Sequence, residues 1–273
     1  MKNIRLITLE NINLAELTDI WNRCWNGYYY DMTYTSEHIR AWLHLTQVSL
    51  QNSSAIIVDD HVAGFVLLSG DGIDGWIAGA CIDPHYRRKG LFTPLMHTQL
   101  NLATRVGLKR VYLEVLEQNH ALKVYDSVGF KRVRQLNIYR NQTRVNSLSE
   151  SKVEARPLVT VPLEQYFENR RRAFFKPAWQ RREGYLRRYG PSLAVMNLVG
   201  TAGALFSGNE NPPCLDAWSA TEVGAQEVIT SVLGRPNVSF SLTNQPEDWV
   251  AACLSAYGIN PSVKQFEMCI ELT

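Results

Sequence analysis

The chain has 273 residues, of which 45% are apolar, and this is enough to build the core of one large domain or two modest ones. Its formal net charge is only +2, so overall charge gives no support for a nucleic-acid or membrane partner. Any electrostatic partner has to be identified from local clusters of charge.

The first half of the chain predicts helices and strands in a regular order. The expected strands are 4–9, 54–58, 62–68, 76–82, 110–116 and 133–139. Turns at Asp59-Asp60 and at Gly70–Gly75 join the second to fourth strands. The expected helices begin at Asn13 and Thr35 and then cover 92–106 and 121–128, the last closed by Gly129.

The second half repeats this order of elements with little residue identity. Helical patterns cover 163–189, 221–233 and 247–256, and strand patterns cover 192–199, 202–206, 214–219, 238–242 and 263–272. The polar stretch 141–154 lacks periodicity. We therefore expect domains at 1–140 and 161–273, a linker at 141–160, and a degenerate internal duplication.

Cysteine spacing and the N-terminus bear on the compartment. No two of the five cysteines have the close spacing of a zinc site or a redox CxxC motif. They are Cys24, Cys81, Cys214, Cys253 and Cys269. The N-terminus has no secretory signal, and no stretch approaches the ~20 apolar residues of a membrane span. The sequence predicts a soluble cytoplasmic protein with reduced thiols, no metal and no membrane partner.

The segment 81–92 combines a strand end, a basic turn and a helix start. Gly90 lets the backbone approach a bulky anion, and the first helical turn directs unpaired N–H groups toward it. Arg87, Arg88 and Lys89 add positive charge. The loop is neither a Walker A sequence nor a dinucleotide fingerprint. Taken alone, it is also consistent with a basic turn on a solvated face.

Two linked motifs resemble the GCN5-related N-acetyltransferase (GNAT) family. Arg87-Arg88-Lys89-Gly90-Leu91 is similar to its loop Arg/Gln-x-x-Gly-x-Gly/Ala, with Phe92 where a small residue is usual. Leu113-Glu114-Val115, followed by Asn119, Ala121, Leu122, Tyr125 and Gly129-Phe130, resembles the second motif. Asn119 lies six residues before Tyr125, one fewer than usual, so its role stays open. The resemblance is strong over 52–140 and extends to the C-terminal half only by element order.

This resemblance implies a mixed-sheet α/β acyl-CoA N-acyltransferase fold, apparently duplicated, with acetyl-CoA as cosubstrate. Backbone groups of the strand end would pair with the pantetheine arm, and N–H groups of 88–93 would hold the pyrophosphate. The thioester would lie where the strands 76–82 and 110–116 splay apart. The implied cofactor-binding residues are Cys81, Ile82, Asp83, Arg87, Arg88, Lys89, Gly90, Leu91, Phe92, Thr93, Asn119, Leu122 and Tyr125.

Acetyl transfer needs a proton donor for the leaving thiolate and a way to neutralise the amine. Tyr125 is the candidate acid, with a core aromatic as the alternative reading. Glu114 is the candidate base, with a solvated strand carboxylate as the alternative. Its rivals are Asp74, Asp31 and Glu117. A backbone N–H of the strand 76–82 would stabilise the oxyanion.

The acceptor side is predicted from aromatic residues after the first helix. Tyr28, Tyr29 and Tyr30 would form an apolar wall and Asp31 would bind a cationic amine, and Trp76 could face the same cleft. Packing between two helices explains the aromatic residues equally well. The sequence does not identify the acceptor beyond a primary amine of a small molecule or peptide.

The second half lacks a basic glycine loop, and Leu254 stands where the spacing from Gly258 would place the acid. We expect this half to bind no CoA and to wall off the acceptor cleft or mimic a dimer partner. Basic residues interleave there with aromatic ones, which is typical of a solvated helix face and less often of nucleic-acid binding. The basic residues are Arg170, Arg171, Arg172, Lys176, Arg181, Arg182, Arg187 and Arg188.

The sequence therefore predicts an N-acetyltransferase, monomeric or homodimeric, that uses direct attack by the amine. The alternatives are a longer acyl donor, a non-catalytic CoA-binding regulatory module, and a nucleic-acid-associated protein.

Overall fold

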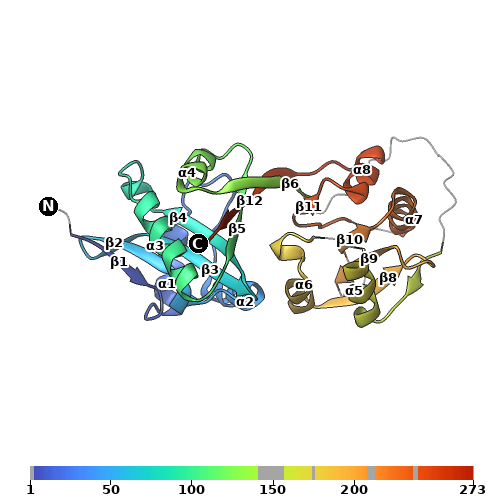
Figure 1. Ribbon diagram of the computed structural model, residues 1–273, viewed down its shortest axis with the longest axis horizontal. Helices are drawn as coiled ribbons and strands as arrows, with labels where there is room; N and C mark the ends of the chain where they lie inside the picture. The colour runs from blue at the N-terminus through green and yellow to red at the C-terminus, as the bar shows by residue number, and fades with distance from the viewer. Residues whose placement is uncertain (1–2, 141–156, 174–175, 208–212, 236–238, 273) are drawn as a thin grey trace. The chain divides into compact units, whose positions relative to one another are not determined.

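The computed structural model describes residues 3–140, 157–173, 176–207, 213–235 and 239–272 (Figure 1). The chain divides into two compact units. Unit 1 comprises Met1–Val133 together with Glu267–Thr273, and unit 2 comprises Arg134–Phe266. Most of the predicted linker, residues 141–156, lies outside the described residues.

Unit 1 is built on a mixed sheet. Its first strands are β1 (Ile4–Thr8), β2 (Ser54–Val58), β3 (His61–Asp71), β4 (Asp74–Ile82) and β5 (Arg110–Leu116). They lie side by side in that order, antiparallel from β1 to β4 and parallel between β4 and β5. The predicted mixed α/β sheet is confirmed.

Helices cover both faces of this sheet. They are α1 (Leu14–Cys24), α2 (Ser36–Thr46), α3 (Phe92–Arg105) and α4 (Ala121–Val128), with short 3-10 turns η1 (Leu50–Asn52) and η2 (Pro84–Tyr86). On β2, Ala55 joins the apolar cluster that contains Trp21 of α1. Its neighbour Ser54 donates a hydrogen bond to Gln99 of α3 at 2.8 Å. Because successive strand residues point to opposite faces, α1 and α3 lie on opposite sides of the sheet.

Local capping groups explain where these helices begin and end. The Asn13 side chain accepts from the Glu16 N–H at 2.9 Å, and Thr35 forms a capping box with His38. Gly129 follows α4 with φ +112°, a left-handed conformation that glycine adopts without strain. These boundaries agree with the sequence prediction.

The turn between β3 and β4 is shorter than predicted. A turn was expected over Gly70–Gly75, but the strands remain paired as far as Asp71 and Asp74. Only Gly72 and Ile73 connect them, and Gly72 has φ +61°. A two-residue hairpin with a glycine at positive φ continues the pairing to its tip, so the glycines at 70 and 75 belong to strands.

Unit 2 carries a four-stranded antiparallel sheet in the order β10-β9-β8-β7. Its strands are β7 (Val159–Thr160), β8 (Pro191–Met196), β9 (Ala202–Ser207) and β10 (Cys214–Ser219). Its helices are α5 (Leu163–Arg172), α6 (Glu183–Tyr189), α7 (Glu222–Leu233) and α8 (Trp249–Ala256), with the 3-10 turn η3 (Trp179–Arg181). Strands and helices therefore follow one another as in unit 1.

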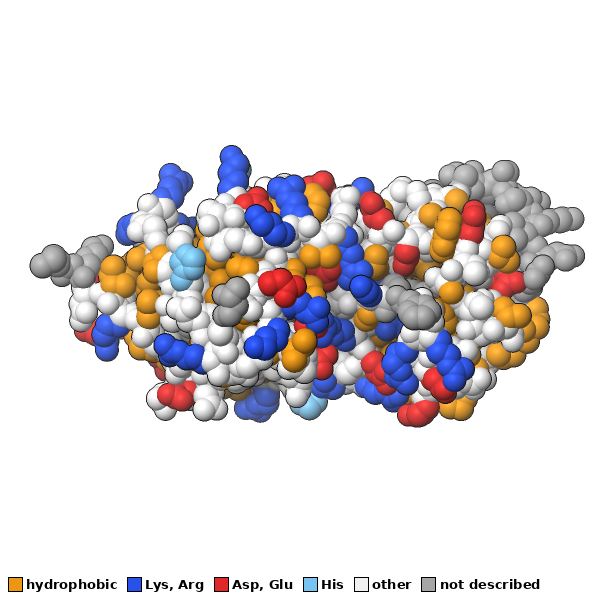
Figure 2. Space-filling view, viewed as in Figure 1, with side chains coloured by type: hydrophobic (Ala, Val, Ile, Leu, Met, Phe, Trp, Pro, Cys, Tyr) orange, Lys and Arg blue, Asp and Glu red, His pale blue; other side chains and the backbone are white. Residues whose placement is uncertain are grey.

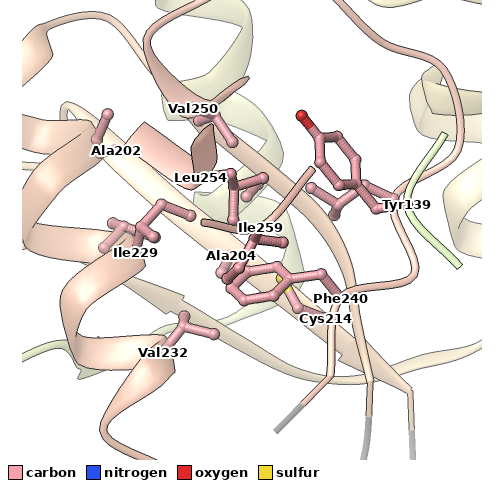
Figure 3. Packing of buried hydrophobic residues seen from close by; sticks show 14 of the residues in the cluster. Tyr139, Ala202, Ala204, Cys214, Ile229, Val232, Phe240, Val250, Leu254 and Ile259 are labelled. Atoms are coloured by element: carbon pink, nitrogen blue, oxygen red, sulfur yellow. The ribbon is translucent and has the colours of Figure 1, made fainter. Parts of the chain in front are cut away.

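The core of unit 2 lies where α7 and α8 pack on its sheet. Figure 3 shows Leu254 of α8 among Val250, Ile259 and Ala204, all buried apolar residues. Tyr139 belongs to the same cluster. The core of unit 2 thus includes residues of α8, of β9 and of the segment that contains Tyr139.

Two predicted elements of unit 2 are wrong. The helical pattern over 163–189 is broken, because α5 ends at Arg172 and a helix resumes only at Glu183. Pro177 lies in the gap, and proline disrupts a helix interior. The strand expected at 238–242 is reduced, over its described residues, to a single bridge between Phe240 and Cys214. Residue 238 lies outside the described residues.

Two strands contribute residues to both units: β6 (Lys131–Ile138) and β12 (Val263–Glu271). In unit 1 the end of β12 lies between β5 and the start of β6, and the Leu272 N–H donates to Lys109 O at 2.8 Å. In unit 2 the end of β6 pairs with β11 (Gln245–Pro246). This division differs from the expected 1–140 and 161–273, because pairing between distant strands decides it.

No helix in the described parts of the chain is long and apolar enough to cross a membrane.

Candidate active site

The central feature of unit 1 is an opening between β4 and β5. The two strands pair only at their starts, from Asp74 with Arg110 to Trp76 with Tyr112. The register between β3 and β4 then shifts so that Ala78 is an extra residue on β4. A bulge bends its strand and increases the local twist, which separates the rest of β4 from β5. This is the splay that the sequence predicts between these strands.

Glu114 lies on β5 at the start of this opening. Its Oε2 accepts a hydrogen bond from the indole Nε1 of Trp76 on β4 at 2.6 Å. Trp76 is only 3% exposed and Glu114 is partly buried. Glu114 is therefore not a solvated carboxylate, and Trp76, expected on the acceptor wall, orients its side chain.

The rival carboxylates lie in different settings. Asp74 forms an ion pair with Arg110 at 2.8 Å, where β4 and β5 are still paired. Asp31 is exposed and accepts from the Thr33 N–H at 2.9 Å, and hydrogen bonds from Thr33 lower its pKa. Glu117 is exposed beyond the end of β5. Among these carboxylates, Glu114 is the one on β5 just beyond the last paired residues of β4 and β5.

Tyr125 lies on α4 and is 7% exposed. Its ring packs edge-on against Phe92 of α3 and Phe130, with ring centroids 5.6 and 5.8 Å away. Burial raises the pKa of Tyr125 well above the ordinary phenol value, with smaller contributions from Tyr28 and Cys81. The two smaller contributions indicate that Tyr28 and Cys81 lie near Tyr125. Phe92, unusual at its motif position, serves as a packing partner of Tyr125.

The basic loop leads from β4 into α3 through two left-handed residues, Arg88 with φ +60° and Gly90 with φ +72°. Both are exposed, and a side chain at Gly90 would meet nothing within 4 Å. Lys89 donates to His85 O at 2.6 Å and lies over the Tyr86 ring. The 14-residue helix α3 then begins with no side-chain cap and no acidic residue in its first turn. Its N–H groups at Phe92 and Thr93 are thus placed to receive an anion.

The other residues of the predicted loop hold the protein together. Asp83 is 2% exposed and accepts from Arg23 at 2.6 Å and from the His85 N–H at 2.9 Å. Burial alone would raise the pKa of Asp83, but these hydrogen bonds and the charge of Arg23 lower it overall. Arg87 bonds to backbone carbonyls. Neither Arg23 nor the direction of Arg87 was evident from the sequence, because their partners lie about 60 residues away.

Asn119 caps α4. Its side-chain oxygen accepts from the Ala121 N–H at 2.9 Å, and its side chain also hydrogen-bonds to Tyr28. Leu122, one turn before Tyr125, is buried. The role that the sequence left open for Asn119 therefore includes fixing the start of the helix that carries Tyr125.

The predicted acceptor residues form a chain of aromatic contacts. Trp25 and Tyr28 are 4.7 Å apart between ring centroids, and Tyr28 and Tyr29 are 5.2 Å apart. Burial raises the pKa of Tyr28 to about 12, although the bond from Asn119 opposes this. Tyr29 donates to Gln118 O at 3.2 Å, and Tyr30 is partly buried. Trp25 was predicted only as a helix residue, yet its indole Nε1 is buried and has no hydrogen-bond partner among the described residues.

In unit 2, strand β10 carries a residue at the centre of a buried cluster of charged side chains. Asp216 of β10 is fully buried and binds Arg170 at 3.0 Å and Arg181 at 2.9 Å. Arg181 also donates to Ala217 O at 2.7 Å and to the side chain of Gln245. By element order, β10 corresponds to β4 of unit 1, so this guanidinium lies against the strand that matches β4.

The turn after β10 also differs from the loop of unit 1. Only Ala220 and Thr221 separate β10 from α7, and the Thr221 hydroxyl accepts from the Gly224 N–H at 3.0 Å. The N-terminus of α7 is therefore capped by a side chain, whereas that of α3 is not. Leu254, at the position matched to Tyr125, is fully buried among apolar residues.

The basic and aromatic cluster of unit 2 is largely neutralised within the protein. Arg170 and Arg181 are buried against Asp216, while Arg171 and Arg187 both pair with Glu183. Figure 2 shows lysine and arginine side chains scattered among acidic and uncharged ones on the face in view, not gathered in one stripe. Because two of these arginines are buried and others pair with carboxylates, the cluster does not form one continuous basic face for a nucleic acid.

The described cysteines, histidines and acidic residues form neither a metal site nor a disulfide. Among the described residues, no group of three or more His, Cys, Asp or Glu side chains could hold a metal ion. The cysteines are free, and three of them, Cys24, Cys81 and Cys214, are buried.

Comparison with known sequences identifies one family. Residues 14–130 match the family described as acetyltransferase (GNAT) family. This segment contains the opening, the basic loop and Tyr125. No curated protein matches the chain in sequence.

Three solved structures resemble nearly the whole chain. A putative acetyltransferase from Pyrococcus horikoshii is 14% identical with a TM-score of 0.65, over 100% of this chain and 90% of its own. A GCN5-related N-acetyltransferase from Sphaerobacter thermophilus is 12% identical with a TM-score of 0.66, over 98% and 96%. A tandem GNAT protein from the clavulanic acid biosynthesis pathway is 12% identical with a TM-score of 0.60, over 100% and 99%. At these identities the likeness concerns the fold.

Proposed function

We propose that this chain transfers an acetyl group from acetyl-CoA to a primary amine of a small molecule or peptide, because residues 14–130 match the acetyltransferase (GNAT) family. The observation that carries the proposal is the opening between β4 and β5. It has an uncapped helix N-terminus at the cofactor side and Glu114 and Tyr125 around it.

The residues of the loop suit a diphosphate. The first turn of α3 offers backbone N–H groups and the positive end of the helix dipole. Gly90 leaves open space beside them, and Arg88 adds an exposed positive charge. Beyond Trp76, the edge of β4 has no β5 partner and can pair with an extended pantetheine arm. These features support acetyl-CoA as cosubstrate, which supplies the acyl group as an activated thioester.

The protein's own groups would then move two protons. Glu114, held by Trp76, takes a proton from the attacking amine, directly or through water. Tyr125 gives a proton to the departing thiolate. A backbone N–H of β4 beyond Trp76 donates to the carbonyl oxygen as negative charge develops there.

The acceptor would lie against the aromatic residues of the loop after α1. Tyr28 and Tyr29 both reach the turn between β5 and α4, since Tyr28 bonds to Asn119 and Tyr29 to Gln118. Asp31 is exposed, and hydrogen bonds from Thr33 lower its pKa below the ordinary carboxyl value. A cationic amine would meet this carboxylate before the aromatic wall.

A matched pair of glycine variants tests the cofactor site. Gly90→Glu places a negative side chain at a left-handed position beside the proposed pyrophosphate. We expect acetyl-CoA affinity to fall by at least about 100-fold, because charge repulsion adds to backbone strain. Gly72→Glu is the control, since Gly72 also has φ +61° and open space but lies in the turn between β3 and β4.

Titration calorimetry with acetyl-CoA measures both variants. The control should bind like the wild-type protein. Equal affinity in wild type and Gly90→Glu would refute the cofactor site. A screen of amino acids, polyamines, aminoglycosides and peptides for acetyl-CoA consumption tests the transfer itself, and binding without turnover on any amine would favour the non-catalytic module.

A further inference from the structure

Arg87 makes a set of contacts that phosphate binding does not explain. Its guanidinium donates three hydrogen bonds, all to backbone carbonyls. Nε donates to Ile82 at 2.9 Å, and Nη2 donates to Cys24 at 2.9 Å and to Asn26 at 3.3 Å. Ile82 ends β4, Cys24 ends α1, and Asn26 begins the loop that leads to Tyr28. The side chain therefore connects the cofactor strand with the acceptor loop.

We propose that Arg87 is a positioning residue for acetyl transfer. It holds the loop after α1, and with it the acceptor wall, in register with the end of β4. This inference rests on the proposed function of the opening between β4 and β5. It gives Arg87 a geometric role that is separate from the electrostatic role of Arg88 beside it.

A second arginine crosses the same junction in the opposite direction. Arg23, in the last turn of α1, donates to the buried carboxylate of Asp83 at 2.6 Å and to Val62 O at 2.8 Å. Arg23 thus reaches from the helix to the strands, while Arg87 reaches from the strand end back to the helix. The hydrogen bonds of Arg23 and Arg87 together hold the end of α1 against the ends of the strands.

The three carbonyl groups that accept hydrogen bonds from Arg87 suit an arginine side chain. The last carbonyls of a helix lack intrahelical partners and carry the negative end of its dipole, so a cation is favourable at Cys24, the last residue of α1. A guanidinium is a planar fork that can bond several carbonyls at once. A lysine ammonium keeps the charge but cannot span the three carbonyls. Substitution by lysine therefore separates geometry from charge.

The position of the loop at Asn26 matters for groups farther along the site. Two residues later, Tyr28 hydrogen-bonds to Asn119, whose side chain accepts from the N–H of Ala121, the first residue of the helix that carries Tyr125. Displacement at Asn26 would move Tyr28 relative to Asn119 and change the separation between acceptor wall and acid. The expected kinetic effect is on the acceptor and on turnover, not on cofactor binding.

The experiment compares lysine and glutamine at two neighbouring positions. Arg87→Lys and Arg87→Gln should behave alike, with a kcat/KM for the amine lowered about tenfold or more and an acetyl-CoA Kd within about threefold of wild type. Arg88→Gln should weaken acetyl-CoA binding in a salt-dependent way, and Arg88→Lys should restore it. Neither Arg88 variant should change the KM for the amine.

Hydrogen–deuterium exchange provides a readout that does not need turnover. Backbone amides over 24–30 should exchange faster in both Arg87 variants and at the wild-type rate in both Arg88 variants. Full recovery by Arg87→Lys of what Arg87→Gln loses would show that Arg87 acts through charge and would overturn the proposal. Unchanged exchange and unchanged amine KM in Arg87→Lys would overturn it as well. If the wild-type protein acetylates no amine, the proposed function fails, and the exchange comparison still decides the role of Arg87.

Discussion

At the scale of single residues, the surroundings of Tyr125 affect its proposed role as a proton donor. Burial raises its pKa well above the ordinary phenol value, which keeps the proton in place but makes the phenol a weaker acid. Burial also raises the pKa of the neighbouring Cys81 thiol to about 11, so both groups are held in their neutral forms.

The raised pKa of Tyr125 predicts the alkaline side of the pH profile. A general acid must be protonated, and a raised pKa extends the protonated range upward. We expect kcat/KM to rise as the acceptor amine, whose ordinary pKa is near ~10, loses its proton, with no fall below about pH 10. A rate that falls between about pH 8 and 9, in step with an ionising enzyme group, would contradict this assignment.

Variants at the two proposed catalytic residues complete this prediction. Tyr125→Phe should lower kcat by about 100-fold or more with little change in acetyl-CoA affinity, because only the hydroxyl is removed. Glu114→Gln keeps an oxygen that can accept the Trp76 hydrogen bond but cannot take a proton, so it should also lower kcat. Stopped-flow or steady-state kinetics measure both. Full activity in either variant would remove that residue from its role.

At this scale the sequence suggests candidate site residues, but it does not reveal their hydrogen-bond partners. Glu114 and Tyr125 follow from motif spacing, whereas the bond between Glu114 and Trp76 joins residues 38 positions apart. Arg87 shows the limit most clearly. Its charge suggests an anion, but its nearest acceptors are carbonyls 5, 61 and 63 residues away, which only the folded chain brings together.

At the scale of elements, the buried cluster around Asp216 joins α5, η3 and β10. Asp216 is fully buried and accepts from Arg170, Arg181 and the Tyr166 hydroxyl. Burial alone would raise the pKa of Asp216, but the two guanidinium groups and their hydrogen bonds lower it overall. The three charged groups are a structural part of unit 2, because removal of one charge would leave the others buried without compensation.

Asp216→Asn should lower the free energy of unfolding by about 3–5 kcal/mol, because it leaves two buried cations with one fewer anion. Since the folded pKa of Asp216 is depressed, its stabilisation is present above the unfolded pKa near ~3.9 and is lost as pH falls below it. Urea unfolding from pH 6 to pH 3 should therefore show a steeper acid loss in wild type than in Asp216→Asn.

Asp60→Asn is the matched control for this measurement. Asp60 also pairs with an arginine, Arg5, but its side chain is 84% exposed and the pair is screened by water. No measurable change in unfolding is expected. A loss in Asp216→Asn as small as that of the control would contradict a structural role for the buried cluster.

Elements with local signals were predicted, and elements that depend on distant partners were not. Asn13, Thr35 and Gly129 cap helices through contacts within a few residues, so their boundaries are visible in the sequence. The strand expected at 238–242 failed because its pairing with β10 stops after Phe240. The placement of β12 beside β5 depends on a partner far along the chain and leaves no local pattern.

At the scale of the whole molecule, the exchange of strand ends makes unit 1 depend on residues 267–273. Met268 is fully buried, and the end of Ile270 would lie 3.3 Å from a Cβ atom at Gly129. These residues cover the edge of β5, the strand that carries Glu114.

Truncation after Phe266 should therefore abolish acetyl-CoA binding, although every proposed cofactor residue lies between 81 and 125. Circular dichroism and calorimetry measure this, with truncation after Leu272 as the control that keeps β12 and its bond to Lys109. Wild-type affinity in the shorter protein would show that unit 1 needs no strand from the end of the chain.

The same exchange has a consequence for how the chain folds as it is synthesised. β5 is complete at residue 116, but its neighbour over 267–271 is translated roughly 150 residues later. At about 5–20 residues per second, the nascent first unit would wait on the order of 10–30 seconds with an open strand edge. Such edges pair readily with other chains, so the ribosome-bound intermediate is the stage most exposed to aggregation and most in need of a chaperone.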